Sequence, residues 1–235
     1  MASFIFRIGL VGIGLAVGVL LTMVLGEAQP PENIEQARID AAIDAYASAQ
    51  QAEREAASDA SVANSASDLL RDPDTPVLGN PDGDVSLISF FDYTCVFCKA
   101  AEPRVRQLLE NDDGVRLVLK DFPILTPESL TASKAALASA RQGLYENYHN
   151  ALMDFRGQLS EARIFEIAQE VGLDVDRLRD DMESPEIAEH IIANFNLARA
   201  LRVFSTPTFI VNDRMIHQPS AEIDFPARIA AARID

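Results

Sequence analysis

The chain has 235 residues, of which 48% are hydrophobic, and it carries a net charge of −16. This hydrophobic content suffices for a sizeable core and excludes an intrinsically disordered chain. The acidic charge argues against a nucleic-acid partner, because nucleic-acid phosphates would be repelled. The length suits one good-sized domain with an additional segment.

The first 26 residues are expected to enter a membrane. Residues 8-25 are uncharged and almost wholly apolar, and 18 residues of helix span about 27 Å, close to the bilayer core of about 30 Å. Arg7 precedes this stretch and acidic residues follow it, so the positive-inside rule places the rest of the chain outside the cytoplasm. Small residues at Gly26 and Ala28 also suit cleavage by a signal peptidase. Residues 1-26 are therefore predicted to be a transmembrane anchor or a signal peptide.

Residues 27-68 are predicted to form a helical stalk and a linker. The segment from Glu32 to about Ala57 is rich in the helix-favouring residues Ala, Glu, Gln and Arg. A short apolar stripe on one helix face consists of Ile39, Ile43 and Tyr46. The stripe then turns polar, which is too short for a firm coiled-coil assignment, so a stalk and an oligomerisation helix both stay open. Residues 58-67 are small and polar, which favours a flexible linker.

Residues 69-126 are predicted to begin an α/β domain. The expected elements are a short strand at Val77-Leu78, a buried strand over Val85–Phe91, a helix from the cysteines to about Glu110 that contains Pro103, and a strand over Val115–Leu119. The near-continuous apolar run of the second strand is typical of a strand buried on both faces. The last three elements form a β-α-β unit, which implies two parallel strands joined by a right-handed crossover.

The remainder of the chain is predicted to change from helical to hairpin structure. Apolar residues recur at helical spacing from Pro127 to about Arg202, which indicates a helical region over residues 127-202. In residues 203-235, two short apolar runs flank Asn212-Asp213, a hairpin signal, and a last helix follows over Phe225–Ala231.

The only two cysteines of the chain are Cys95 and Cys98, at the start of a predicted helix. A disulfide that closes so small a loop would contribute only about 2 kcal/mol, which is poor for architecture and leaves redox chemistry as the favoured role. Unpaired N–H groups at a helix N-terminus stabilise a thiolate, so Cys95 is the expected nucleophile. A zinc site would need two further ligands, and His149, His190 and His217 are scattered without ligand spacing. No metal and no cofactor are therefore predicted.

Other polar residues near the cysteines are expected to have ordinary roles. Lys99 is interpreted as a solvated charge that slightly favours the thiolate, and Asp92 as a solvated charge as well. The three histidines are interpreted as surface residues or as satisfied internal ones, because thiol exchange needs no imidazole once the helix activates the thiol.

The order of these motifs resembles the DsbA family of thiol oxidoreductases. A CxxC pair follows a buried strand, a proline lies five positions past the second cysteine, and Ser205-Thr206-Pro207-Thr208-Phe209 precedes a hairpin. Pro207 lies 109 positions after Cys98 (207 − 98), which leaves room for the helical insertion that this family has. The segments Gly79–Val85 and Phe90–Lys99 are similar to the subgroup that includes BdbD, Com1 and ScsC. The expected fold class is α/β: a thioredoxin-like fold with an inserted helical domain, preceded by an N-terminal membrane segment and a helical stalk.

The resemblance also implies a function and a set of site residues. Cys95 and Cys98 would form the redox pair, and Thr206 and a cis Pro207 would lie beside it and pair with an extended substrate. Val96 and Phe97 would add apolar substrate contacts, although the histidine found between the cysteines of DsbA itself is absent, which suggests a weaker oxidant. Ser205 stands where related proteins often carry glycine.

The expected activity is the formation of disulfides in exported proteins on the periplasmic side of the bacterial inner membrane, with recycling by a membrane redox partner (DsbB-like or DsbD/ScsB-like). A disulfide isomerase or reductase kept reduced by such a partner is the main alternative. A redox-inactive peptide-binding chaperone is a weaker one, because binding alone does not require Cys98. Kappa-class glutathione transferases resemble the chain less, since their motif lacks the cysteine pair.

Overall fold

A computed structural model describes residues 34-65, 69 and 75-234 of the chain. The membrane segment predicted over residues 8-25 lies outside this part, and no helix among the described residues is both long and apolar enough to span a bilayer. The chain divides into two compact units, Met1–Gln51 and Ala52–Asp235. Each unit is described by itself.

Helix α2, Ile34–Asn64, extends further than the sequence predicts. In the first unit its apolar stripe is exposed, as Ile43 keeps 59% of its surface. The flexible linker predicted over residues 58-67 is wrong for residues 58-64, which are helical. The segment is helical because it packs on the second unit, which composition does not reveal. Val62 is fully buried in an apolar cluster of that unit, and Asp59 Oδ1 accepts a hydrogen bond of 3.0 Å from the Met215 N–H.

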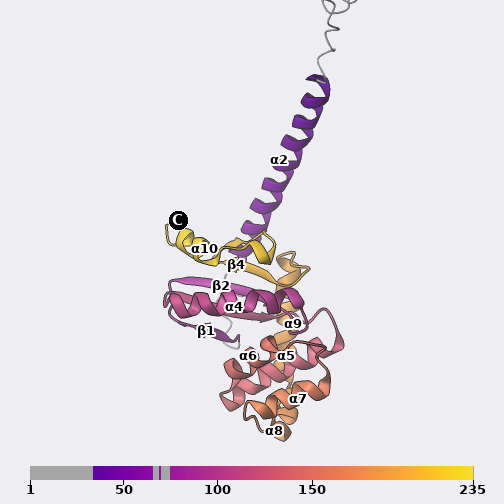
Figure 1. Cartoon of the computed structure of the whole chain (residues 1–235), viewed down its shortest axis with the longest axis vertical. Helices are drawn as coiled ribbons and strands as arrows, with labels where there is room; N and C mark the ends of the chain where they lie inside the picture. The colour runs from indigo at the N-terminus through magenta and orange to yellow at the C-terminus, as the bar shows by residue number, and fades with distance from the viewer. Residues whose placement is uncertain (1–33, 66–68, 70–74, 235) are drawn as a thin grey trace, which may run out of the picture. The chain divides into compact units, whose positions relative to one another are not determined.

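The second unit is built on one five-stranded sheet with the strand order β1-β3-β2-β4-β5 (Figure 1). The strands are β1 Val77–Gly79, β2 Val85–Phe91, β3 Val115–Asp121, β4 Thr208–Val211 and β5 Arg214–Met215. The central strands β2 and β3 are parallel, as predicted, and the other pairs are antiparallel. Both central strands carry apolar residues on both faces because the sheet is covered on both sides.

Alternate residues of β2 belong to two separate apolar cores. Phe91 packs in the larger core with helices α4, Val96–Asn111, and α10, Phe225–Ala232. Phe90 packs in the smaller core with the last turns of helix α9, Pro185–Ala200. This alternation follows from the two-residue period of a strand.

Five α-helices lie between β3 and β4 along the chain. They are α5 Pro127–Ser139, α6 Tyr145–Asp154, α7 Glu161–Glu170, α8 Val175–Met182 and α9, with the short 3-10 helix η1 Ala140–Gln142 after α5. Several of these helices begin at a residue whose side chain caps the first turn. The Thr126 hydroxyl, for example, accepts a hydrogen bond from the Ser129 N–H in a capping box. A second 3-10 helix, η2 Ser220–Glu222, precedes α10.

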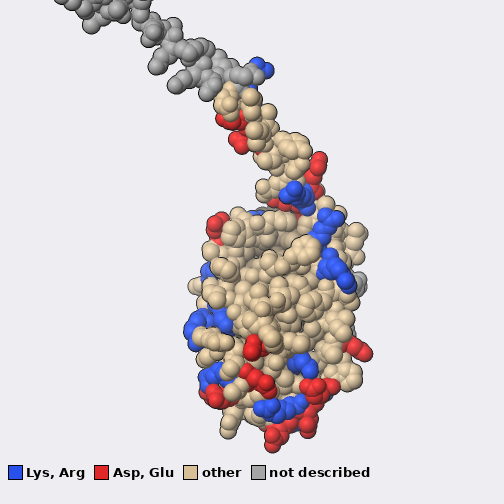
Figure 2. Space-filling view, turned by 90° about the vertical axis from the view of Figure 1, so that its right-hand side faces the viewer, with Lys and Arg blue, Asp and Glu red and all other residues tan. Residues whose placement is uncertain are grey.

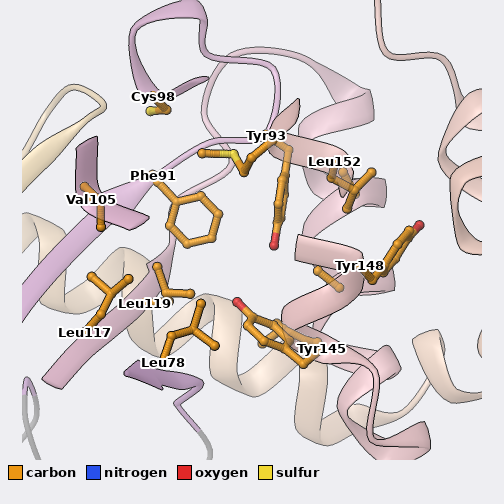
Figure 3. Packing of buried hydrophobic residues seen from close by; sticks show 14 of the residues in the cluster. Leu78, Phe91, Tyr93, Cys98, Val105, Leu117, Leu119, Tyr145, Tyr148 and Leu152 are labelled. Atoms are coloured by element: carbon orange, nitrogen blue, oxygen red, sulfur yellow. The ribbon is translucent and has the colours of Figure 1, made fainter. Parts of the chain in front are cut away.

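The larger core continues from the sheet into these helices. Figure 3 shows the rings of Phe91 and Tyr93, from the end of β2, between the strands and the α6 residues Tyr145, Tyr148 and Leu152. The Phe91 and Tyr93 rings meet edge to face, with their centroids 5.0 Å apart. The segment that leads into the cysteines is therefore fixed by large buried side chains.

Candidate functional site

The cysteine pair lies where β2 passes into α4. Cys95 is the N-cap residue of α4, and its Sγ accepts a hydrogen bond of 3.3 Å from the Cys98 N–H. The Cys95 N–H in turn donates to the Asp92 carbonyl at 3.0 Å, which closes the turn before the helix. The sequence predicts this placement, and the structure brings both cysteines to the first turn of one helix.

The two thiols have opposite electrostatic environments. Hydrogen bonds from the Cys98 thiol, and further from Thr206 and the N–H groups of Cys98 and Phe97, lower the pKa of Cys95 to about 6 against the opposing effect of burial. Burial raises the pKa of the Cys98 thiol far above its usual range. Both cysteines are free in this structure.

Both cysteines are buried: a nucleophile is expected to be partly exposed, yet Cys95 retains only 3% of its surface and Cys98 only 2%. Tyr93 and the loop around Thr206 enclose the pair, and the thiol of Cys95 donates to the Thr206 carbonyl at 3.3 Å. The neighbouring Val96 and Phe97 are instead strongly exposed, at 74% and 67%.

The predicted loop at Pro207 lies beside the cysteines, although 111 positions separate Cys95 from Thr206. The Thr206–Pro207 peptide bond is cis, as the resemblance implies. A groove of about 570 Å³ extends from this loop. Its walls come from Phe97, from residues 202-208 and from residues 215-221.

Asp92 has a larger role than the sequence suggests. Its interpretation as a solvated charge is wrong, because it is fully buried and its carboxylate accepts five hydrogen bonds. The donors are the Thr94 N–H and hydroxyl, the Ser129 hydroxyl, and the N–H groups of Ile124 and Leu125. The carboxylate thus ties the turn before Cys95 to the loop after β3 and to α5. The pattern Asp-x-Thr right after a buried strand could have indicated the local part of this arrangement.

Lys99 also differs from its predicted role. It is only 7% exposed, its Nζ donates to the Leu152 carbonyl, and burial lowers its pKa to about 8. His149 and Glu102 are also buried, and their Nε2 and Oε1 atoms are 3.7 Å apart. The other ring nitrogen of His149 is hydrogen-bonded to the Tyr93 hydroxyl at 2.9 Å, whereas Nε2 is buried without a hydrogen-bond partner among the described residues. His149 is therefore internal, as one of the two interpretations predicts, but only partly satisfied. The acceptor of Lys99 lies in a distant helix, which local sequence does not reveal.

The three histidines do not come together with the cysteines as ligands. His149 and His190 are buried in different places, and His217 is exposed in the groove. Within residues 34-65, 69 and 75-234 there is no group of three or more His, Cys, Asp or Glu side chains arranged to hold a metal ion.

A dithiol at the first turn of a helix, behind a buried parallel strand and beside a cis-proline loop, defines a thiol-disulfide oxidoreductase with a thioredoxin-like α/β fold. The model of the DSBA-like thioredoxin domain matches residues 86–225, which is more than half of the chain. The chain belongs to this DsbA-like family.

Solved structures agree with this assignment. A thioredoxin-like oxidoreductase from Silicibacter pomeroyi is 41% identical, with a TM-score of 0.68 over 72% of this chain and 98% of its own. The thiol-disulfide exchange protein alpha-DsbA2 from Wolbachia pipientis is 27% identical, with a TM-score of 0.70 over 77% of this chain and 97% of its own.

A curated relative has a different overall organisation. The Na(+)/H(+) antiporter NhaA 3 of Salinispora tropica is 34% identical over 151 residues, which are 63% of this chain and 23% of the antiporter. The chain therefore matches about a quarter of that relative's length.

Proposed function

We propose that this protein forms disulfides in exported proteins, with Cys95 as the nucleophile and Cys98 as the resolving thiol. The observation that carries the proposal is the opposite shift of the two thiols: Cys95 has a pKa of about 6, and the pKa of Cys98 is strongly raised. A stabilised thiolate makes the reduced form more favourable, and a redox pair with a stable reduced form is an oxidant.

The proposed reaction has two exchange steps. A substrate thiolate attacks Cys95 Sγ of the Cys95–Cys98 disulfide, the disulfide breaks, and Cys98 leaves and takes up a proton. A second substrate thiolate then attacks the substrate sulfur of the mixed disulfide, and Cys95 leaves as its low-pKa thiolate. The substrate dithiol has been oxidised to a disulfide and the enzyme pair reduced. A membrane redox partner would return the enzyme pair to the disulfide.

The substrate would lie along the groove in extended form. Thr206, next to Pro207, would pair with its main chain, which supplies affinity without reading the sequence. Val96 and Phe97 support this role because exposed apolar side chains beside a reactive centre favour contact with unfolded segments.

We also propose that the catalytic unit is held at the periplasmic side of the inner membrane by residues 8-25, through a helical stalk, unless these residues are removed as a signal peptide. The five helices between β3 and β4 would be the inserted domain of residues 127-202. The homologous segment of the Salinispora antiporter, joined there to an ion transporter, is compatible with a tethered domain of this kind.

The redox state of Cys95 in growing cells tests the proposal. Cells that produce the full chain are quenched in acid, and free thiols are alkylated with a reagent that shifts gel mobility. Samples reduced or oxidised before alkylation mark the two limits. An oxidase is expected to be mostly oxidised, because its membrane partner keeps the disulfide form supplied. Mostly reduced protein would contradict the proposal and would favour an isomerase or reductase.

A further inference from the structure

The groove beside Cys95 differs in charge from the chain as a whole. The chain has a net charge of −16, yet none of the residues that line the groove is Asp or Glu. Its ionisable lining residues are Arg202 and His217, and both are exposed. On the face that Figure 2 shows, most acidic side chains of the second unit lie toward the end that carries α7 and α8, with basic side chains among them. An anionic group would therefore meet a locally favourable site in an otherwise acidic protein.

Arg202 makes no ion pair and no side-chain hydrogen bond with any residue that the structure describes. Six other arginines of the second unit bridge to acidic side chains: Arg106, Arg141, Arg163, Arg177, Arg179 and Arg233. Others, such as Arg104 and Arg228, donate to neutral oxygens. The guanidinium of Arg202 thus keeps its planar set of N–H donors available. That donor set matches a carboxylate, which it can bind through two parallel hydrogen bonds.

The backbone at Arg202 gives a second, independent indication. Helix α9 ends in a Schellman motif, in which the Val203 N–H donates to the Ala198 carbonyl at 2.8 Å and the Arg202 N–H donates to the Arg199 carbonyl at 3.2 Å. Arg202 occupies the left-handed position of this motif, with φ of 57°. Glycine is the usual residue there because a Cβ is strained at positive φ. An arginine at this position works against local stability, and such residues are enriched at functional sites.

The side chains around Arg202 indicate which other groups a bound substrate segment would carry. Phe204, two positions after Arg202, is 77% exposed, and Phe97 faces the same groove from the start of α4. The thiol of Cys95 lies next to Thr206 at the edge of this groove. The groove therefore combines apolar walls with one unpaired guanidinium, and the buried Cys95 thiol contacts its Thr206 wall.

We propose that Arg202 is a specificity-determining residue that selects substrate segments carrying an Asp or Glu near the reacting cysteine, within an apolar stretch. The inference rests on the proposed function, since it concerns the substrates of the same site. The carboxylate would bind the Arg202 guanidinium, with the ring of His217 as a further donor, while apolar substrate residues lie against Phe97 and Phe204. Such a pair increases the rate of encounter, and salt weakens it.

The test uses three dithiol peptides that differ at one position next to a cysteine, with Glu, Gln or Lys. The rate at which each reduces the Cys95–Cys98 disulfide of the full chain is measured at low and at high salt. We expect the ratio of the Glu rate to the Gln rate to be about two- to fivefold higher for the unaltered chain than for Arg202→Gln, the range that an exposed ion pair supplies. Differences in thiol reactivity between the peptides cancel in this comparison.

Three further variants make the test specific. Arg202→Glu should reverse the preference toward the Lys peptide. Arg202→Gly should lose the preference while its melting temperature stays the same or rises, because glycine suits the left-handed backbone. Arg177→Gln, which removes one exposed positive charge from α8, should keep the preference of the unaltered chain.

The outcomes separate the two proposals. Equal Glu-to-Gln ratios in the unaltered chain, Arg202→Gln and Arg177→Gln would overturn the role of Arg202, even if every peptide reacts. A preference that high salt does not weaken would overturn it too, because it would not be electrostatic. Failure of all three peptides to reduce the disulfide would instead contradict the proposed function itself, and the substrate inference would fall with it.

Discussion

Two identical side chains acquire different chemistry from their positions on one helix. Cys95 caps α4 and accepts hydrogen bonds, whereas Cys98, one turn later, is desolvated in the core. The lowered pKa of Cys95 favours its thiolate near neutral pH, whereas burial favours the neutral thiol of Cys98. Because the folded pKa of Cys95 is depressed, its contribution to the stability of the reduced form is full above the pKa of an unfolded thiol. That contribution is lost as the pH falls through about 6.

The first prediction concerns the pH dependence of the reduction potential. Below a pH of about 6, reduction takes up two protons, so the potential should fall by about 60 mV per pH unit. Above the pKa of Cys95, only Cys98 takes up a proton, and the slope should be about −30 mV per pH unit. Equilibration with glutathione from pH 5 to 8 measures the slope. One steep slope over the whole range would mean that Cys95 stays protonated.

The second prediction concerns Asp92, whose carboxylate accepts five hydrogen bonds from groups beside Cys95 and in the α5 region. Asp92→Asn places an amide NH₂ against some of these donors and should cost about 2–5 kcal/mol of unfolding free energy, measured by urea denaturation. The control is Asp113→Asn, the same change at an exposed site, which should stay within about 0.5 kcal/mol. Equal losses of unfolding free energy in the two variants would show that the buried carboxylate of Asp92 stabilises the fold no more than an exposed one.

At the scale of elements, α2 has two differently used halves. Its first half exposes the apolar stripe that includes Ile43, whereas its last turns belong to the second unit, where Val62 is buried with Leu69 and Ile88. The predicted linker therefore contributes to the fold of the catalytic unit. A bond from the Met215 N–H to Asp59 also satisfies an edge-strand donor of β5.

The third prediction follows from this difference. Val62→Ala should reduce the unfolding free energy of the second unit by about 1–3 kcal/mol, because it removes buried methyl groups and leaves a cavity. The matched change Ile43→Ala, in the same helix but 59% exposed, should change it by less than about 0.5 kcal/mol. Denaturant unfolding of both variants gives the comparison. If Val62→Ala were as mild as Ile43→Ala, the end of α2 would not be part of this core.

The sequence predicts the elements of the fold better than the polar environment of the site. The buried strand β2 and helix α4 follow from local periodicity and from the CxxC motif, so their bounds agree closely with the structure. The burial of Lys99 and Asp92 depends on acceptors and donors in distant segments, such as the Leu152 carbonyl and the Leu125 N–H. No local pattern carries this information. The position of the Pro207 loop beside the cysteines could be predicted only from the resemblance to a family, because residue spacing alone does not indicate it.

At the scale of the whole molecule, the fold brings two segments that are far apart in sequence to one reactive sulfur. The strand-to-helix turn supplies the thiols, and the loop before β4, more than a hundred positions later, supplies the Thr206 carbonyl and one wall of the groove. The helices between these segments separate them along the chain but do not interrupt the sheet, since β2 and β4 pair directly. The chain can therefore lengthen between β3 and β4 without displacing the site.

The roles of the two cysteines are the central claim, and trapping of the mixed disulfide tests them most directly. The full chain is prepared as Cys98→Ser and as Cys95→Ser, each is incubated in reduced form with an unfolded disulfide-bonded protein, and the reaction is quenched in acid. Intact-mass measurement should find a covalent adduct on Cys98→Ser, released by dithiothreitol, and little on Cys95→Ser, because the pKa of Cys95 is lowered whereas that of Cys98 is raised, which keeps the Cys98 thiol protonated. Equal adducts on both variants, or more on Cys95→Ser, would contradict the account.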